Sequence, residues 1–416
     1  MALVRPEARD AFRADLVAAL DESRSSVVPG KVAARDSTWT KWEEFCAEVG
    51  ADPLLPPDSA AQAHLEPIAL LQVFAKRYRN GSLAKNKSKN PVRGCTVEDA
   101  LRDIGQTLTS LGISDPRLQP SGRLQPLLKN QITYYKKQDG PSRRVRPVTI
   151  AIVRQVVEMA QSASATPRQK AIADLIVIAF FFLCRPGEYV PLQAETRSTP
   201  FRICDATFYA HATCLSAADA PLNDLELADY VTLTFNDQKN STKGEQIGHG
   251  LSGDPLLCPV AALRRRCAAL RSHDAPATTP LYTVFGPSGS TSNITTAEIT
   301  AALRAAAHDI YHITGIPPDE ITARSLRSGG ATTLLCANVD TSTIQLIGRW
   351  KSDAMLRYLI VQARPLMADN AAKMVAHGDF TLAPNSDAPI HTLPWFADNH
   401  IAIPPPMVEP IGVAAC

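Results

Sequence analysis

The chain has 416 residues, of which 45% are hydrophobic and 20% are charged, and its formal net charge is only +2. This length predicts two domains of roughly 100–200 residues each, and the composition is that of an ordinary globular protein. The small net charge excludes a uniformly basic chain, so any binding of nucleic acid has to come from local clusters of Lys and Arg.

The first residues lack the apolar segment of a secretory signal. The longest apolar run, residues 175–184, is far shorter than the ~20 residues that a membrane helix needs, so we expect a buried core helix and no membrane partner. The nine cysteines are scattered without a C-x-x-C pair, which argues against a zinc knuckle or a disulfide scaffold and favours a reducing compartment, nuclear or cytoplasmic.

The N-terminal third is predicted to be mostly helical. Residues 34–49, 68–78 and 96–111 each place apolar side chains at helical spacing. In the third of these helices Thr96 is the expected N-cap and Gly112 the expected stop. Its buried face is predicted to consist of Val97, Leu101, Ile104 and Leu108.

A basic stretch follows the second of these helices. Residues 76–93 carry seven Lys or Arg and no acidic residue. Clustered cations favour phosphate contact, because binding releases counterions from DNA; the alternative is a solvated loop. The residues expected to bind DNA here are Lys76, Arg77, Arg79, Lys85, Lys87 and Lys89.

Residues 136–147 are the best linker candidate, with a glycine, two prolines and five Lys or Arg. A basic, mobile connection suits a two-domain clamp around a polyanion; the alternative is a plain hinge. Arg143, Arg144 and Arg146 are the expected DNA contacts in this segment, which we place at 141–147 between domains at 1–140 and 148–375.

The larger segment, 148–375, is predicted to mix helices with one small hairpin, a mostly α, α+β fold. It opens with an amphipathic helix at about 149–160, and the strand at 230–235 is expected to pair with 246–249. Further helices are expected at 259–270, 296–312 and 325–337. No Lys or Arg follows residue 373, and the Pro-rich segment 376–416 is interpreted as an extended or disordered tail.

Three local patterns carry the candidate chemistry. FFFLCRPGEYV places Arg185 after an apolar helix, with Glu188 close enough to orient it. TARSLRSGGATTLL places Arg327 on the first turn of a helix of small residues, and LIGRWKSDAMLRYL places Tyr358 on a helix that Ser352 is expected to cap. Taken singly, Arg185 is as consistent with a structural Arg–Glu pair and Arg327 with a surface arginine, while Tyr358 by itself is more typical of a buried helix tyrosine.

Taken together, the order and spacing of R-x-x-E, L-R-x-G-G-A-T and G-x-W-x-S-D-x-M-x-x-Y resemble the tyrosine recombinase, or phage integrase, family over residues 148–375. The GRWKSDAMLRYL form is most similar to recombinases of eukaryotic mobile elements such as cryptons and tyrosine-recombinase retroelements. The N-terminal third, 1–140, resembles that family's helical core-binding domain, and 148–375 its mixed α/β catalytic domain.

The resemblance implies that Tyr358 attacks a DNA phosphate and forms a 3′-phosphotyrosine, while Arg185 and Arg327 clamp the non-bridging oxygens. It implies no metal and no cofactor, double-stranded DNA as partner and a homotetramer on DNA. The family's proton donor is a lysine of a β-hairpin, and Lys239 is favoured here over Lys243 because it lies nearer the strand end.

Two positions depart from the family's pattern. Arg324 stands where His or Lys is usual, and Arg349 stands where His or Trp follows the glycine. A guanidinium donates hydrogen bonds but stays protonated, so it cannot serve as a base. Trp350 is expected either to donate its indole N–H or to pack in the core, and His249 is a further candidate to replace the missing histidine.

Other motifs are weaker. His308 and His312 are four residues apart, as metal ligands can be, but without the Glu of H-E-x-x-H they are interpreted as a helix-surface pair. Three hypotheses follow: an active recombinase or integrase of a mobile element, a decayed or domesticated DNA-binding protein without cleavage, and a type IB topoisomerase that shares the phosphotyrosine chemistry.

Overall fold

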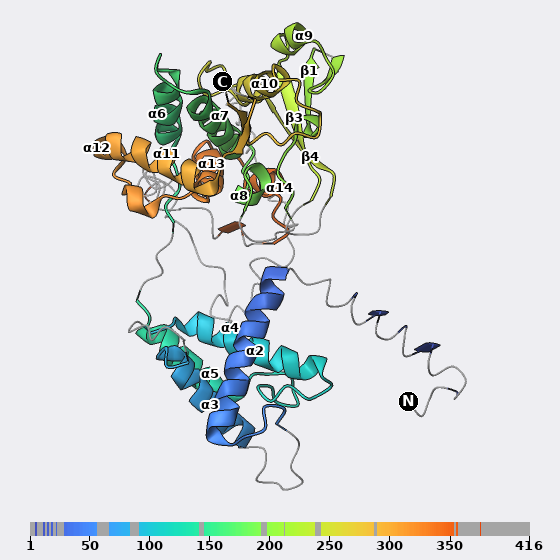
Figure 1. Cartoon of the computed structure of the whole chain (residues 1–416). Helices are drawn as coiled ribbons and strands as arrows, with labels where there is room; N and C mark the ends of the chain where they lie inside the picture. Colours follow the sequence, from blue (N-terminus) through green and yellow to red (C-terminus); the bar gives the residue numbers. More distant parts are fainter. Residues whose placement is uncertain are drawn as a thin grey trace, which may run out of the picture.

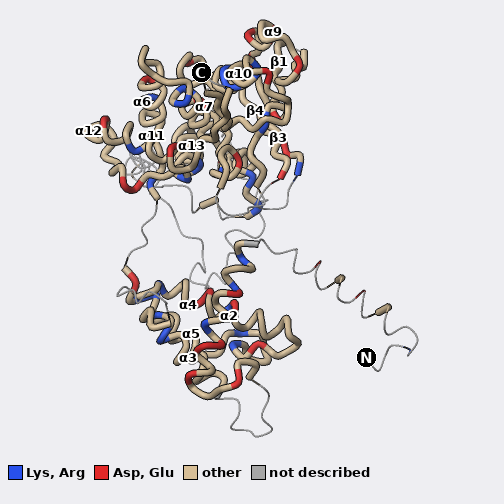
Figure 2. The backbone as a smooth tube through the Cα atoms, viewed as in Figure 1, with Lys and Arg blue, Asp and Glu red and all other residues tan. Residues whose placement is uncertain are grey.

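The computed structural model describes residues 29–55, 66–83, 91–140, 145–192, 198–211, 213–237, 243–286, 289–352 and 355–356, with a few single positions near the termini. The elements fall into two groups, each with its own apolar core (Figure 1). Lys and Arg are spread over both groups and interleaved with Asp and Glu, as the small net charge requires (Figure 2).

The first group consists of α2 (Pro29–Val49), α3 (Glu66–Arg79), α4 (Gly94–Ser110) and α5 (Pro126–Gln138). Trp42, Phe45 and Phe74 meet with ring centroids 5.4–5.7 Å apart and form the centre of its core. The three helices predicted from apolar spacing are all present. All four residues of the predicted face of α4 are buried, because the 3.6-residue repeat places them on one side.

The start of α4 differs from the prediction. The helix begins at Gly94, so Thr96 lies inside it and makes no cap, and the N-cap position, Arg93, makes no side-chain capping bond. The Gly94 N–H instead donates to the Asp139 carboxylate at 2.7 Å, an acceptor supplied from beyond the end of α5. The stop is as expected: Gly112 has φ +81°, a conformation that glycine adopts without strain.

The second group begins with α6 (Ile150–Gln161), α7 (Pro167–Phe181) and the short α8 (Pro186–Tyr189). Every residue from Ala171 to Phe180 is buried, so the long apolar run is a core helix as predicted. The later helices pack around α7 and the sheet (Figure 1). They are α9 (Leu222–Glu226), α10 (Pro259–Arg271), α11 (Thr296–Asp309), α12 (Tyr311–Thr314), α13 (Ser325–Cys336) and α14 (Thr341–Gly348).

An antiparallel sheet lies against α10, with strand order β2-β1-β3-β4. The predicted hairpin is present as β3 (Tyr230–Phe235) and β4 (Glu245–Gly250), with Phe235 opposite Glu245. The sequence analysis missed β1 (Ala206–Ala210), β2 (Thr213–Ser216) and the separate pair β5 (Thr283–Phe285) and β6 (Thr291–Asn293). The described fold is thus mostly α with small antiparallel sheets, the α+β class that was expected.

The linker predicted at 141–147 stays a prediction, because residues 141–144 lie outside the described part of the chain. The wider candidate, 136–147, began too early, since α5 continues through Gln138. The tail at 376–416 also lies outside the described residues.

Candidate functional site

The candidate site is built on the C-terminal end of α7. Leu183 has φ +48°, a left-handed conformation that is uncommon for a branched side chain, and the Cys184 N–H closes the helix by donating to the Ala179 carbonyl at 2.9 Å. This turn directs the Phe182 and Leu183 carbonyls to guanidinium donors instead of to the next helical turn. The end of α7 is therefore a buried set of acceptors at the negative end of a helix dipole.

Arg185 follows this turn and is oriented by Glu188, as the sequence predicted. The Glu188 carboxylate accepts the Arg185 backbone N–H at 2.8 Å and its Nη1 at 2.9 Å. The Arg185 side chain is 18% exposed and that of Glu188 only 1%. The three-residue spacing across α8 permits both bonds, so this pair is determined locally.

Arg349 is the second partner of Glu188. Its Nη2 donates to the Glu188 carboxylate at 2.9 Å and to the Leu183 carbonyl at 3.2 Å, while Nη1 donates to Phe182 at 3.0 Å. The guanidinium carbon lies 3.6 Å from the centroid of the Phe235 ring. Burial lowers the pKa of the Arg349 guanidinium and the Glu188 carboxylate opposes this shift, so the charge is kept by its partner.

Arg349 reaches this position because it is the C-cap of α14. Its φ of +57° and ψ of +43° are left-handed, which turns the chain and sends the side chain back under the helix end. The side chain is 1% exposed. Arg349 thus lies in the interior of the cluster as a donor to protein groups, at the position where the resemblance implies an active-site His or Trp.

Arg327 joins the ends of two helices. Its Nη1 donates to the Leu183 carbonyl at the end of α7, and its Nη2 donates to the Gly348 carbonyl at the end of α14. The guanidinium carbon lies 4.2 Å from the Trp350 ring centroid. Arg327 is only 2% exposed, so the described contacts tie it to the protein, and its assignment to a phosphate oxygen stays a prediction.

The glycines that follow Arg327 permit this approach. A Cβ at Gly329 would lie 2.2 Å from the Val148 carbonyl oxygen, and one at Gly330 would lie 2.3 Å from the Phe180 carbonyl oxygen. Both neighbours are backbone and cannot turn aside. Gly329 and Gly330 therefore allow a close approach of backbones that any residue with a Cβ would prevent.

Glu188 is shared by two of the three arginines. It binds Arg185 and Arg349 directly, whereas Arg327 donates to the Leu183 and Gly348 carbonyls. Arg185 is the partly exposed member of the three, so its guanidinium group attracts an anion from solvent.

The structure describes some of the remaining predicted site residues and not others. Tyr358 and Lys239 lie outside the described residues, whereas Lys243 is described and exposed. Arg324 is also exposed, one position before α13. Trp350 is 7% exposed and packs in a small apolar cluster with Leu183 and Met355, which is the core role that the sequence analysis kept as an alternative.

His249 was considered as a substitute for the missing histidine. Its ring lies edge-on to Phe182 with centroids 4.7 Å apart, and burial lowers its pKa below the ordinary 6.5. His249 pairs with Val231 across the sheet, four positions along β3 from Phe235. The His249 ring therefore packs against Phe182 at the end of α7, and its burial favours the neutral imidazole.

In the N-terminal group, two of the predicted DNA contacts have partners within the protein. Arg79 is 8% exposed, and its Nη1 donates to Asp139 at 2.5 Å and to the Val92 carbonyl. Arg77 pairs with Glu48 at 2.8 Å in an exposed ion pair. The buried pair ties Arg79 to the protein more firmly than the exposed pair ties Arg77, and contact of either residue with DNA stays a prediction.

The other basic residues predicted to contact DNA fall into three groups: one is ion-paired, one is exposed, and the rest lie outside the described residues. Arg146 donates to the Glu320 carboxylate at 2.8 Å, so it is an ion-pair partner within the protein. Lys76 is exposed, as a phosphate contact requires. The other five, Lys85, Lys87, Lys89, Arg143 and Arg144, lie outside the described residues.

The structure adds a groove that the sequence analysis missed. It has a volume of about 680 Å³ and lies along α5, the start of α4 and the preceding loop. Arg123, Lys129 and Lys136 line it together with Gln, Asn and Thr side chains, and Glu98 pairs with Lys136 at 2.7 Å. The spacing of Lys129, Thr133 and Lys136 on one face of a helix was the available signal.

Nothing in the described residues gathers three or more His, Cys, Asp or Glu side chains suited to a metal ion. His308 and His312 are exposed on two successive helices, α11 and α12. Among the described residues, no helix combines the length and apolar character needed to cross a bilayer.

The chain is similar in structure to integrases and a recombinase. The Tn1549 transposon integrase in complex with circular intermediate DNA matches with 14% identity and a TM-score of 0.47, over 86% of this chain and 98% of that one. The lambda integrase dimer bound to a COC′ core site matches with 11% identity and a TM-score of 0.44, over 84% and 95%.

The XerA recombinase matches with 13% identity and a TM-score of 0.35, over 83% of this chain and all of that one (100%). No protein-family profile matches the sequence, and no curated protein matches it either. At these identities and TM-scores, the function of this chain has to be inferred from its own residues.

Proposed function

We propose that this chain breaks and rejoins DNA as a tyrosine recombinase, using Tyr358 as the nucleophile. The observation that carries the proposal is the cluster at the meeting of α7, α13 and α14. Three arginines from separate segments lie together there: Arg185 and Arg349 bind Glu188, and Arg327 donates to the ends of two helices. Such a gathering of guanidinium groups suits a phosphodiester, whose charge increases in the transition state.

The proposed reaction exchanges one phosphate ester for another. The Tyr358 oxygen bonds to phosphorus, the bond from phosphorus to the 5′ oxygen breaks, and the phenol proton passes to water. The leaving 5′ oxygen takes a proton from a hairpin lysine, with Lys239 favoured. The phosphotyrosine keeps the energy of the ester bond, so reversal by a 5′ hydroxyl rejoins the strand without another energy source.

The roles that we propose for the three arginines differ. Arg185 is the partly exposed donor, and Glu188 fixes its direction, so Arg185 meets the phosphate oxygen. Arg349 and Arg327 hold the two helix ends together and supply positive charge from behind. Trp350 supports Arg327 by packing against its guanidinium.

DNA binding is proposed to extend to the N-terminal group. The groove along α5 presents Arg123 and Lys129 among polar side chains that suit a phosphate backbone. Double-stranded DNA is the proposed partner, on which four copies act together, within the nucleus or cytoplasm. Lys85, Lys87 and Lys89 remain proposed contacts.

The second candidate function is DNA binding without cleavage. Arg349 favours it, because a buried guanidinium tied to Glu188 cannot exchange a proton with the reacting groups at neutral pH. In that case the cluster holds phosphate as a relic of the ancestral chemistry.

A trapped-adduct experiment separates the two. A pool of nicked duplexes with a randomised segment is incubated with the chain, so that cleavage beside the nick releases a short fragment and prevents rejoining. We expect a covalent protein–DNA adduct that survives denaturation and is lost in Tyr358→Phe. If wild type and Tyr358→Phe both bind DNA but give no adduct, cleavage is refuted and binding alone remains. Relaxation of supercoiled plasmid without site preference would instead indicate a topoisomerase.

The groove is tested by the salt dependence of binding. Replacing Arg123 and Lys129 by Gln should reduce the slope of log K against log salt by about 2, since each phosphate contact contributes about 0.9. Arg102→Gln is the matched control, because Arg102 is an exposed arginine of α4 that pairs with Asp99 outside the groove. An equal slope for the double variant and the control would remove the groove from the DNA interface.

A further inference from the structure

The end of β3 is held on both faces by different partners. Phe235 lies beneath the Arg349 guanidinium at 3.6 Å, and the next residue, Asn236, donates its side-chain N–H to the Asp205 carboxylate at 2.5 Å. Successive side chains of a strand point to opposite faces. The strand end is thus fixed between the guanidinium cluster on one side and a carboxylate on the other.

Asp205 is itself rigidly held. It is 4% exposed, and its carboxylate accepts the Arg202 backbone N–H at 2.8 Å and its Nη2 at 3.0 Å. The backbone between them is anchored by the Ile203 N–H, which donates to the Thr279 carbonyl at 3.1 Å. Asn236 therefore bonds to a fixed acceptor and not to a mobile surface group.

Backbone hydrogen bonds also hold the two ends of the loop that joins β3 to β4. The Gly244 N–H donates to the Phe235 carbonyl at 2.9 Å, and the Asp237 carbonyl accepts the Thr199 N–H at 3.4 Å. In the sequence, both lysine candidates for the proton donor fall between Asn236 and Gly244. The direction in which the hairpin leaves the sheet is set where these bonds are made.

We propose that Asn236 and Asp205 are positioning residues for proton transfer to the leaving 5′ oxygen. This inference rests on the proposed recombinase function. By holding the end of β3 against the Arg349–Glu188 pair, the Asn236–Asp205 bond sets the hairpin lysine in register with the phosphate that Arg185 binds. Neither residue touches DNA in this scheme.

The proton donor is needed only for an oxygen leaving group. When the Tyr358 oxygen bonds to phosphorus and the 5′ oxygen departs, an alkoxide forms unless the lysine delivers a proton. If sulfur replaces that bridging oxygen, the leaving group is a thiolate, which is stable unprotonated because thiol pKa values are about 8.5. A variant that only misplaces the proton donor should therefore cleave the sulfur substrate at the wild-type rate.

The experiment compares cleavage rates on oxygen and sulfur substrates built on the site that the adduct selection yields. Asn236→Ala should slow cleavage of the oxygen substrate about 10- to 100-fold, a part of the roughly 100- to 10,000-fold that general acids contribute. It should cleave the sulfur substrate within about 2-fold of wild type, as Lys239→Ala or Lys243→Ala should. DNA affinity should not change.

Gln246→Ala is the matched control. The Gln246 side-chain amide donates a hydrogen bond to the Thr234 hydroxyl at 3.4 Å on the same hairpin, without reaching Asp205. Asp205→Asn keeps an acceptor oxygen for Asn236, so its defect should be smaller than that of Asn236→Ala and equally rescued by sulfur. This second variant keeps the test open if Asn236→Ala unfolds.

Two results would overturn the inference. One is equal rates for Asn236→Ala and wild type on the oxygen substrate. The other is a defect of the same size on both substrates, which would indicate a general loss of structure. Failure of the recombinase proposal itself is distinguishable, because wild type would then cleave neither substrate.

Discussion

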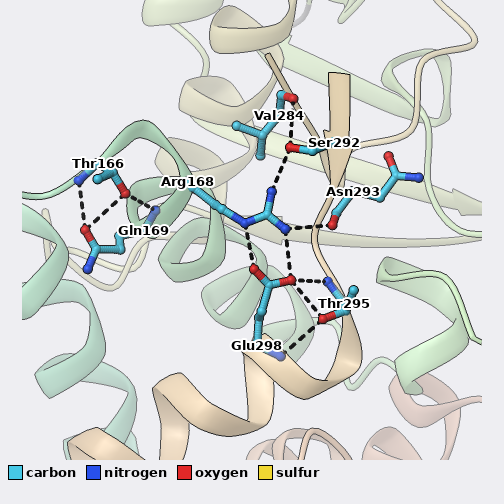
Figure 3. A network of polar contacts seen from close by, with 8 residues as sticks. All are labelled: Thr166, Arg168, Gln169, Val284, Ser292, Asn293, Thr295 and Glu298. Atoms are coloured by element: carbon cyan, nitrogen blue, oxygen red, sulfur yellow. Dashed lines mark hydrogen bonds and ion pairs between the residues drawn. The ribbon is translucent and has the colours of Figure 1, made fainter. Parts of the chain in front are cut away.

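Glu188 and Glu298 both bind arginine, but one is buried and shared by two arginines and the other is partly exposed and binds one. Glu188 serves Arg185 and Arg349 in a site where its own side chain is 1% exposed. Glu298 serves Arg168 alone, through bonds of 2.6 and 2.9 Å, and both side chains are about a third exposed (Figure 3). The Ser292 hydroxyl and the Asn293 carbonyl accept further N–H groups of Arg168, so this second network pairs one cation with one carboxylate and neutral acceptors.

The two networks contain the same kinds of side chain, Arg and Glu. One stabilises the fold, and the other is proposed to bind the reacting phosphate. The Arg168 network joins the start of α7 to β6 and α11, with one cation balanced by one anion. In the cluster around Glu188, one buried carboxylate serves two guanidinium groups. An exposed pair of one cation and one anion contributes little, whereas a buried carboxylate shared by two cations is sensitive to any change of partner.

The largest effect is expected from Glu188→Gln. Removing this carboxylate takes a bonded counter-charge from the buried Arg349, so the free energy of unfolding should fall by about 3–5 kcal/mol. Denaturant unfolding measures this, with Glu298→Gln as the control at below about 1 kcal/mol. Equal losses in the two variants would erase the distinction between the sites.

Arg327→Lys should follow in size. An ammonium group cannot reach both the Leu183 and Gly348 carbonyls that Arg327 joins, so one buried acceptor loses its donor. We expect a loss of about 1–3 kcal/mol in the free energy of unfolding, read from the same unfolding curves. A lysine variant as stable as wild type would show that the two helix ends do not depend on a forked donor.

Sulfate should stabilise the chain by a smaller amount. At ten times its dissociation constant, an anion bound to the folded state alone adds about 1.4 kcal/mol. Thermal unfolding in sulfate and chloride at equal ionic strength measures the difference, after subtraction of the general salting-out effect seen in Arg185→Met. The comparison is contradicted if Arg185→Met gains as much from sulfate as wild type does.

The smallest effect is expected at Arg168. Its hydrogen bonds lower the pKa of Glu298 from 4.5 to about 2. A lowered acid pKa gives stability that is present above pH 4.5 and lost as the pH falls from 4.5 to 2. Arg168→Met should be less stable than wild type by below about 1 kcal/mol at pH 7 and equal to it near pH 2, measured by unfolding across that range. A constant difference would mean that packing, and not charge, stabilises this network.

The sequence was most informative where partners are close along the chain. The i, i+3 relation of Arg185 and Glu188 allowed their pairing to be predicted, and alternation identified β3. The strands β1 and β2 were missed because they are five and four residues long, too short for a clear period. The bond from Arg79 to Asp139 could not be predicted, because the two residues are 60 positions apart.

The sequence by itself thus determined that Arg185, Arg327 and Tyr358 stand in recombinase-like contexts, since each context is a short run of residues. Only the tertiary structure decided that Arg349 and Arg327 turn inward, because the carbonyls they bind appear where the ends of α7 and α14 meet. Glu188 and Arg349 are 161 positions apart. Helix ends leave unpaired carbonyls whose partners are chosen by packing, and no local pattern of residues encodes that choice.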